Sequence, residues 1–465
     1  MIKYVDVFQD HPPAKITLEE WTERFEAVSD EEIARYTYYH NADWGRYLFP
    51  PVIYMVYGTR ELNRLRFDNS FAALRMWGFI FNETERLFRA SQVNKKVIAT
   101  MGDLGIVPVI AQSFPNCVPF YPECIWWTPF FRESTELLDC ATRLGAPEAA
   151  CFSRAALAAF YKKAYFPRPD LLIASTGATC DDYSCVMQMV EDFGFNPLWI
   201  EAPVRRVARP GEPTDGYDIN GYPRRFEDYL IAEYKTVWNA LVSLTGINNL
   251  NRLKDSITKA NRLRNMVEEI KALAADAEQA PLPALELMAI EFGNLYGYAD
   301  AEEWLAIVEM LRDLVRQRVH DRRGVLDRRA LPLAWVTPSA DPFLLNLVEN
   351  MGGRIVATEY VINQSLVPIE DNLEPFRALA RAFLKSSLIG TTRERISRIQ
   401  HLAQTGRIRG AIITNMLGAS HCAMETRLIE QMTTGIPVLS LDVPAPFGIT
   451  EQLVTRIEAF METLR

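Results

Sequence analysis

The sequence predicts an α/β protein in which two domains with parallel sheets are joined by a helical segment and preceded by a helical N-terminal extension. From about residue 95, short apolar runs alternate with segments of helical periodicity, and the same alternation returns near residue 331. Between these regions, apolar residues recur at helical spacing from about 226 to 320. Regular alternation of strands and helices is typical of parallel sheets covered by helices.

The N-terminal extension and the first α/β domain are expected over residues 1–90 and 91–215. The extension is rich in Tyr, Trp and Phe, and it is expected to be helical with irregular stretches. Residues 204–225 are rich in Gly, Pro and charge, which indicates a linker or exposed loop. The strands expected in the first domain are the apolar runs 95–101, 170–176 and 196–203.

The helical segment and the second α/β domain are expected over residues 216–330 and 331–465. Gly246 ends the first long helical pattern, as a glycine at a helix C-terminus does. The strands expected in the second domain are 331–339, 353–360, 409–416 and 436–443. The last helix carries four apolar residues on one face: Leu453, Ile457, Met461 and Leu464. Both domains are expected to be Rossmann-like.

Composition excludes several classes of protein. The net charge of −9 argues against a nucleic-acid platform, which normally shows a basic face. The start of the chain lacks a basic segment followed by an apolar run, so no secretory signal is expected. The uncharged stretch 104–122 contains four prolines and does not suit a membrane helix. We expect a cytoplasmic protein.

The seven cysteines do not form a recognisable disulfide or zinc pattern. Their number is odd and no export signal is present, so a disulfide framework is not expected. No CxxC pair occurs, which leaves a zinc ribbon or a ferredoxin-type cluster unsupported. The chain also lacks a P-loop, a GxGxxG after a strand, HExxH and GxSxG, so the chain itself is not expected to hydrolyse ATP.

Cys180 and Cys422 occupy corresponding places in the two domains. Each follows a predicted strand and a loop with a glycine, Gly177 or Gly418, and each precedes a predicted helix. In open α/β sheets this position is the crevice beyond the strand ends, where ligands bind. A helix N-terminus also favours thiolate over thiol. Two thiolates could therefore point into a shared cleft, although a free cysteine more often only packs.

The remaining cysteines differ in what they suggest. Cys151 also precedes a helix and is a third ligand candidate, since two thiolates are too few for a cubane cluster. Cys185 lies inside the helix after Cys180, where a packing role fits better. His421, beside Cys422, is a candidate proton donor, although a lone histidine is more often structural. The other cysteines lie at positions 117, 124 and 140, in and near an aromatic, Pro-rich segment.

From about residue 95 to its end, the chain resembles the benzoyl-CoA reductase/2-hydroxyacyl-CoA dehydratase family, particularly its cluster-bearing subunits. The segments that carry the resemblance are AACFSRAALAAF, IASTGATCDD, GASHCAMET, GIPVLSLDV, PSADPFLLNLVENMGGRIVATEY and EQLVTRIEAFMETL. The resemblance implies that Cys151, Cys180 and Cys422 each ligate one iron of a [4Fe-4S] cluster. It also implies a related second subunit in a heterodimer, or a homodimer, and a separate ATP-dependent iron–sulfur activator protein.

Four functions remain open. The segments GASHCAME and GGRIVATEY favour a one-electron reductase of aromatic acyl-CoA thioesters, of the benzoyl-CoA type. The first alternative is a 2-hydroxyacyl-CoA dehydratase, and the second is a reductase with a larger, double-cubane-type iron–sulfur assembly, which needs more protein ligands. The third, from another class, is a cluster-free binding protein whose two lobes close on a ligand.

Overall fold

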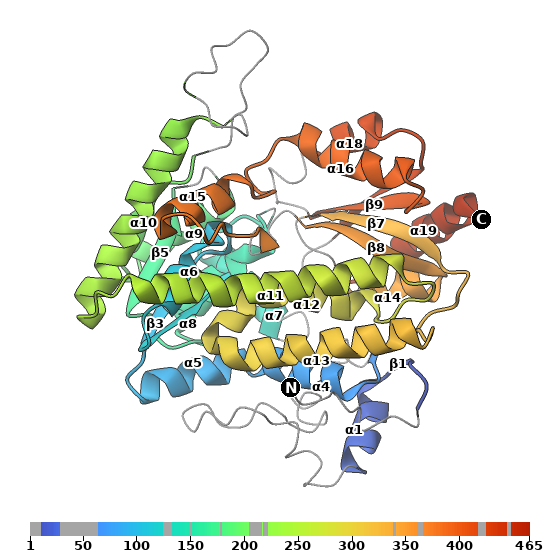
Figure 1. Ribbon diagram of the computed structural model, residues 1–465, viewed down its shortest axis with the longest axis horizontal. Helices are drawn as coiled ribbons and strands as arrows, with labels where there is room; N and C mark the ends of the chain where they lie inside the picture. The colour runs from blue at the N-terminus through green and yellow to red at the C-terminus, as the bar shows by residue number, and fades with distance from the viewer. Residues whose placement is uncertain are drawn as a thin grey trace.

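The structure is a computed structural model dominated by two parallel sheets (Figure 1). It describes residues 11–27, 64–123, 133–148, 150–176, 179–203, 216, 222–337, 341–360, 366–416, 425–443 and 448–465. Within these residues each sheet has four strands, and the pairing inside each is parallel throughout. The predicted α/β fold class is confirmed. No described helix combines the length and the apolar character that crossing a membrane requires.

The first sheet has the strand order β4-β3-β5-β6 and, with its covering helices, is called the first lobe. Its strands are β3 (Lys96–Thr100), β4 (Cys117–Phe120), β5 (Leu171–Ser175) and β6 (Leu198–Ile200). Strands β3, β5 and β6 were predicted from their apolar runs, and β4 was not. The β4 segment contains Pro119, and a proline inside an apolar run argues against a strand. Because β4 is an edge strand that pairs with β3 alone, the missing N–H is tolerated there.

The second sheet repeats this topology and, with its helices, is called the second lobe. Its order is β10-β9-β7-β8, so the strands match those of the first sheet one by one. The strands are β7 (Leu331–Thr337), β8 (Gly353–Tyr360), β9 (Gly410–Met416) and β10 (Val438–Val443), all of which were predicted. In both sheets the order reverses between the first and third strands, and ligands bind beyond the carboxyl ends of strands at such a reversal.

Helix α19 (Glu451–Leu464) closes the chain and packs on β10. The apolar face predicted for this helix is confirmed, since its four members are buried together with Phe460. Thr450 caps the helix with a hydrogen bond from the Leu453 N–H to its hydroxyl. The match between apolar spacing and burial explains why this element could be located from the sequence alone.

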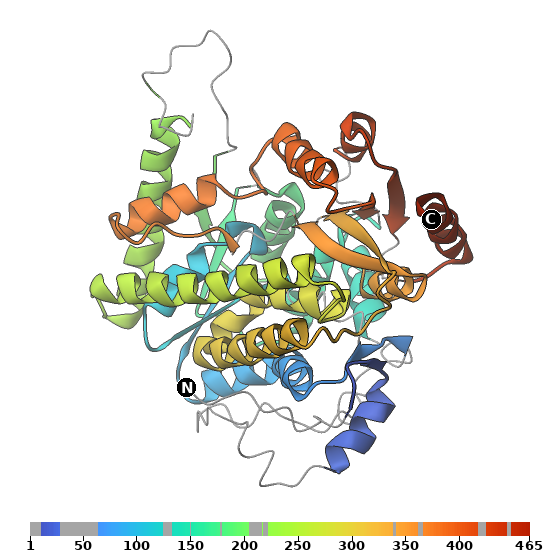
Figure 2. The ribbon, with the colours of Figure 1, turned by 45° about the vertical axis from the view of Figure 1, so that its right-hand side comes forward.

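Long helices connect the lobes. They are α10 (Arg224–Thr245), α11 (Asn251–Asp276), α12 (Ala284–Tyr296) and α13 (Ala301–His320). Helix α10 ends at Gly246, whose φ of 72° is the left-handed conformation expected of a glycine there. Helix α11 packs on both α6 (Val107–Gln112) of the first lobe and β8 of the second. Figure 1 shows α11 crossing in front of both sheets, and Figure 2 shows the same yellow-green helix running from one lobe toward the other.

The N-terminal extension adds an antiparallel pair of short strands that was not predicted, β1 (Lys15–Ile16) with β2 (Phe67–Asp68). It also holds α1 (Leu18–Glu26), α4 (Phe71–Phe81) and α5 (Glu83–Gln92). Two buried ion pairs attach the strands to the second lobe and to α13. Lys15 Nζ lies 2.8 Å from Glu349 Oε2, and Arg318 Nη1 lies 2.5 Å from Asp68 Oδ2.

Glu286 on α12 also contacts the N-terminal extension, and its titration makes the stability of the protein depend on pH. Its carboxylate accepts hydrogen bonds from the Asp68 N–H at 2.8 Å and from Trp77 Nε1 at 3.1 Å. Burial, and then the charge of Asp68, raises the pKa of Glu286 from 4.5 to about 8. The folded chain therefore keeps a proton that the unfolded chain releases, so this contribution to stability falls as pH rises from about 4.5 to about 8.

Replacing Glu286 with Gln, which resembles the protonated acid, is expected to remove that fall in stability. Urea unfolding at about pH 5 and about pH 8 measures it: relative to wild type, Glu286→Gln should gain stability at the higher pH. An equal difference between the two proteins at both pH values would contradict the assignment.

Candidate functional site

Cys180 and Cys151 lie together beyond the carboxyl ends of the first sheet. Cys180 follows β5 and is the N-cap residue of α9 (Asp181–Glu191), with extended backbone. Cys151 directly precedes a short 3-10 turn (Phe152–Arg154) and α8 (Ala155–Lys162), which packs on α9. The two thiols are close enough for each charge to bear on the other site, since Cys151 raises the pKa of Cys180. The predicted placement of both residues before helices is confirmed.

The Asp182 carboxylate ties the two cysteine segments together. It accepts a hydrogen bond from the backbone N–H of Cys151, and the Arg154 guanidinium lies near enough to lower its pKa. Burial, followed by the charge of Asp181, nevertheless raises the pKa of Asp182 to about 6. This contact fixes the chain around Cys151 relative to the start of α9.

Burial favours the thiol form of both cysteines. Burial raises the pKa of Cys151 to about 11 and that of Cys180 well above 9.0, and the charge of Asp103 adds to the second shift. The Tyr183 N–H at the start of α9 lowers the pKa of Cys180, but burial outweighs it. The expectation that the helix N-terminus would make Cys180 a thiolate is therefore wrong for the metal-free site. A bound metal ion supplies the positive charge that deprotonates such thiols.

A group of buried acids lies beside Cys180, and the sequence analysis did not find it. Asp103 accepts hydrogen bonds from the Ser175 and Thr179 hydroxyls, yet burial raises its pKa to about 6. Burial and then Asp103 raise the pKa of Glu123 well above 4.5, while the Glu123 and Gly102 N–H groups lower it only partly. Burial and the charge of Glu123 likewise raise the pKa of Tyr183.

Glu123 is packed tightly against the turn after β3. A Cβ atom at Gly102 would lie 2.1 Å from Glu123 Oε1, so a larger residue there would displace this carboxyl group. Neither oxygen of Glu123 has a well-oriented hydrogen-bond partner among the described residues. The only feature of the sequence that could have pointed to these acids is their position just after strands. Asp103 follows the end of β3, and Glu123 follows β4, the strand that was not predicted.

The described residues fit the ligation of an iron–sulfur cluster through two of the three expected cysteines. The two thiols lie close together, and carboxylate oxygens of the neighbouring Asp103 and Glu123 lack well-oriented partners among the described residues. Cys180, Asp181 and Asp182 also bring one ligand atom each within 4.8 Å of one another. One thiolate with two carboxylates is, however, not a cluster ligand set.

Cys422 and His421 lie outside the described residues, so their predicted roles stay predictions. The ends of their loop are described. Strand β9 ends at Met416 in the position that matches β5, and α18 (Thr426–Met432) begins just after the loop. The Thr426 hydroxyl donates to Asn415 Oδ1 and so joins the start of α18 to the end of β9. The described end of β9 therefore corresponds in the second sheet to the end of β5, which precedes Cys180 in the first.

The other described cysteines lie apart from this site. Cys185 is exposed on α9, so its predicted packing role is wrong. Cys117 in β4 and Cys140 in α7 (Glu133–Arg143) are buried, and burial raises the pKa of Cys117 to about 12. Exposure makes Cys185 a suitable control for the candidate ligands Cys151 and Cys180.

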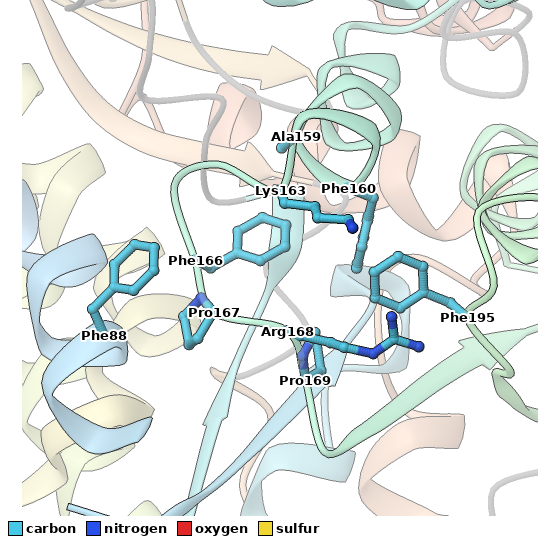
Figure 3. Close-up of a pocket in the computed structure, with 9 residues that line it drawn as sticks. All are labelled: Phe88, Ala159, Phe160, Lys163, Phe166, Pro167, Arg168, Pro169 and Phe195. Carbon is cyan, nitrogen blue, oxygen red and sulfur yellow. The ribbon is translucent and has the colours of Figure 1, made fainter. Parts of the chain in front are cut away.

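A cavity of about 200 Å³ lies at the opposite edge of the first sheet. Its walls come from residues that precede β5 and β6, including Phe166 and Phe195, whereas Cys180 follows β5. Figure 3 shows the side chain of Arg168 next to the ring of Phe195, with 4.5 Å between the guanidinium carbon and the ring centroid. This cavity is therefore separate from the cysteine site.

Fold and site together define a two-lobed α/β protein with paired cysteines at the carboxyl edge of one sheet. A family model described as the D-component of 2-hydroxyglutaryl-CoA dehydratase matches residues 106–464. The chain belongs to this family, and the predicted resemblance to benzoyl-CoA reductases and 2-hydroxyacyl-CoA dehydratases is confirmed. It is a dehydratase-type enzyme subunit. The search of curated proteins found no match.

Proposed function

We propose that this chain is the [4Fe-4S]-bearing subunit of an enzyme that reduces acyl-CoA thioesters by one electron at a time. Cys151, Cys180 and Cys422 are its proposed ligands. The observation that carries the proposal is the meeting of Cys151 and Cys180 beside buried acids at the strand reversal of the first sheet. A cluster bound there supplies a low-potential electron and one iron without a protein ligand.

The side chains around the site hold protons and position the ligands. Asp182 fixes the backbone of Cys151. Burial raises the pKa of Glu123 well above 4.5 and that of Tyr183 well above 10.0, so burial favours the protonated form of both side chains. A buried carboxylic acid near a reacting thioester can give up a proton as negative charge develops. His421 is a second proposed donor.

Two reactions share this chemistry. The family description favours 2-hydroxyacyl-CoA dehydration, whereas the segments near Cys422 and at β8 favour reduction of aromatic acyl-CoA. The proposed partners are a related second subunit, or a second copy of this chain, and an ATP-dependent iron–sulfur activator. Localisation in the cytoplasm stays a prediction.

Purification without oxygen, with iron and sulfide measured per chain, tests the proposal. We expect about four irons per chain and a brown protein. With activator, consumption of reductant in proportion to product identifies a reductase, whereas turnover after activation alone identifies a dehydratase. Protein that stays folded but iron-free after anaerobic reconstitution would leave the two-lobed binding protein as the better description. More than four irons would favour the larger assembly.

Replacing Glu123 with Gln tests its role as a proton donor. The change keeps the size of the side chain, and Glu123 Oε1 and Oε2 have no well-oriented partner to lose among the described residues. We expect turnover to fall about 100-fold, the usual scale for losing a general acid, with iron content unchanged. Unchanged turnover would remove Glu123 from the mechanism, and loss of iron would make it a structural residue instead.

A further inference from the structure

The cavity of about 200 Å³ at the edge of the first sheet opposite Cys180 combines an apolar wall with two basic residues. Four phenylalanines, two prolines and an alanine line it together with Lys163 and Arg168, called the cavity cations, and no lining residue is acidic. Arg168 donates to the Gly194 carbonyl at 2.7 Å and lies over the ring of Phe195. Neither cavity cation forms an ion pair with another described residue. Within the described chain, the positive charge of the cavity is therefore not balanced.

Basic residues beside the cavity are paired, which sets the two cavity cations apart. Lys162 Nζ lies 2.7 Å from Glu136 Oε1. Asp170, at the end of the segment that forms the wall, lies 3.0 Å from Lys96 Nζ and accepts a hydrogen bond from the Val97 N–H at 2.9 Å. Both carboxylates are thus engaged by other groups and do not neutralise the cavity cations.

The turn after α8 holds the backbone of Lys163 in a strained conformation. Lys163 and Tyr165 have φ values of 53° and 73°, so two of the four non-glycine residues with left-handed backbone in the described chain lie in this turn. Such strain costs free energy and concentrates at segments that bind ligands. Figure 3 shows the side chain of Lys163 reaching toward the ring of Phe160. The strained turn therefore presents a cation to an aromatic wall.

The aromatic wall leaves room for one ring. Phe160 stands edge-on to both Phe166 and Phe195, with ring centroids 5.0 Å and 4.9 Å apart. Phe88, which is 41% exposed, lies on the other side of the cavity (Figure 3). An apolar cavity of about 150 Å³ accepts benzene, so this one can hold a single aromatic ring with a small substituent. A ligand ring also packs favourably against the edges and faces of phenylalanines.

We propose that this cavity binds a phosphate monoester of a single-ring aromatic alcohol, with the ring among the phenylalanines and the phosphate between Lys163 and Arg168. A phosphate monoester carries a charge of about −1.5 to −2 at neutral pH, which two cations balance. A carboxylate would neutralise only one of them. No bond forms or breaks in the cavity. The site does not rest on the proposed function, since it lies at the opposite edge of the sheet from Cys180.

Calorimetric titration and thermal unfolding of the full chain with phenyl phosphate test the site. We expect phenyl phosphate to raise the melting temperature. Inorganic phosphate lacks the ring and phenol lacks the charge, so each should bind at least about tenfold more weakly. Lys163→Met and Arg168→Met should each weaken the binding of phenyl phosphate about tenfold or more, because each removes a charge-assisted hydrogen bond. Both residues are exposed, so the ligand-free variants should melt close to wild type.

Lys162→Met is the matched control, because Lys162 is the exposed neighbour of Lys163, pairs with Glu136 and does not line the cavity. This variant should bind phenyl phosphate as wild type does. Phe88→Ala should weaken the binding of phenyl phosphate and leave that of inorganic phosphate unchanged, since Phe88 contributes only to the apolar wall.

Absence of phenyl phosphate binding by wild type would overturn the proposal, as would equal binding by wild type and a variant with both Lys163→Met and Arg168→Met. Benzenesulfonate has a similar shape but a single charge, and binding as tight as that of phenyl phosphate would overturn the phosphate assignment. Equally tight binding of inorganic phosphate would overturn the aromatic assignment. These readouts need no iron, so failure of the cluster assignment leaves them intact.

Discussion

Replacing Cys180 with Ala is expected to remove most of the iron from the anaerobically purified protein and to lower turnover more than about 100-fold, beyond the usual effect of losing a residue that only supports a metal ligand. Cys180 lies beside Cys151 at the carboxyl edge of the first sheet, so its loss removes one of two adjacent proposed ligands. Cys151→Ala should have the same effect. Iron and sulfide analysis with the visible spectrum measures both.

Cys185→Ala is the control for this prediction. Cys185 lies on the same helix, α9, but is exposed, so its variant should keep the iron and the turnover of wild type. A Cys180→Ala protein with full iron content would refute the proposed ligand set. If Cys185→Ala also changed the cluster, additional ligands and a larger assembly would be indicated.

Replacing Asp68 with Asn is expected to lower the free energy of unfolding by about 3 kcal/mol or more, because it leaves a buried guanidinium without its carboxylate. Asp68 is fully buried, and Arg318 Nη1 and Nη2 lie 2.5 Å and 3.3 Å from its two oxygens. The same carboxylate accepts a hydrogen bond at 2.9 Å from the N–H of Ser70, the N-cap residue of α4. Urea unfolding measures the change.

The contrast with an exposed ion pair tests the reason for this loss. Asp327 and Arg329 lie 3.3 Å apart, with side chains 59% and 91% exposed, so Asp327→Asn should lower the free energy of unfolding far less than Asp68→Asn does. Replacing Asp68 and Arg318 together by Asn and Met should cost less than Asp68→Asn alone, since no unpaired charge remains. Equal costs for the buried and exposed pairs would contradict the argument.

The sheets could be predicted because their strands are short apolar runs with clear ends. Strand β4 could not, since Pro119 is compatible with a strand only at an edge, and edge position depends on tertiary pairing. Cys151 and Cys180 were found because both precede helices. Cys185 was misjudged, because its place inside a helix did not tell which face of that helix is buried, and the structure shows Cys185 on the exposed face.

The acidic residues near Cys180 could not be predicted from the sequence and were found only in the folded structure. Asp103, Glu123 and Tyr183 come from three different connections, and nothing in their spacing along the chain brings them together. Their shared property is burial without full pairing, which raises the pKa of each. Burial also explains why Cys180 was wrongly expected to be a thiolate. How far burial raises the pKa of a thiol depends on the residues packed around it, and these come from distant parts of the chain.

Helix α11 also limits how the enzyme can move. Its 26 residues span about 39 Å without a proline or glycine at which the helix would bend. Both α6 and β8 pack on this one straight helix. A rotation of the lobes about the axis of α11 would keep their spacing along the helix, whereas a separation along that axis would break the contacts to α6 or to β8.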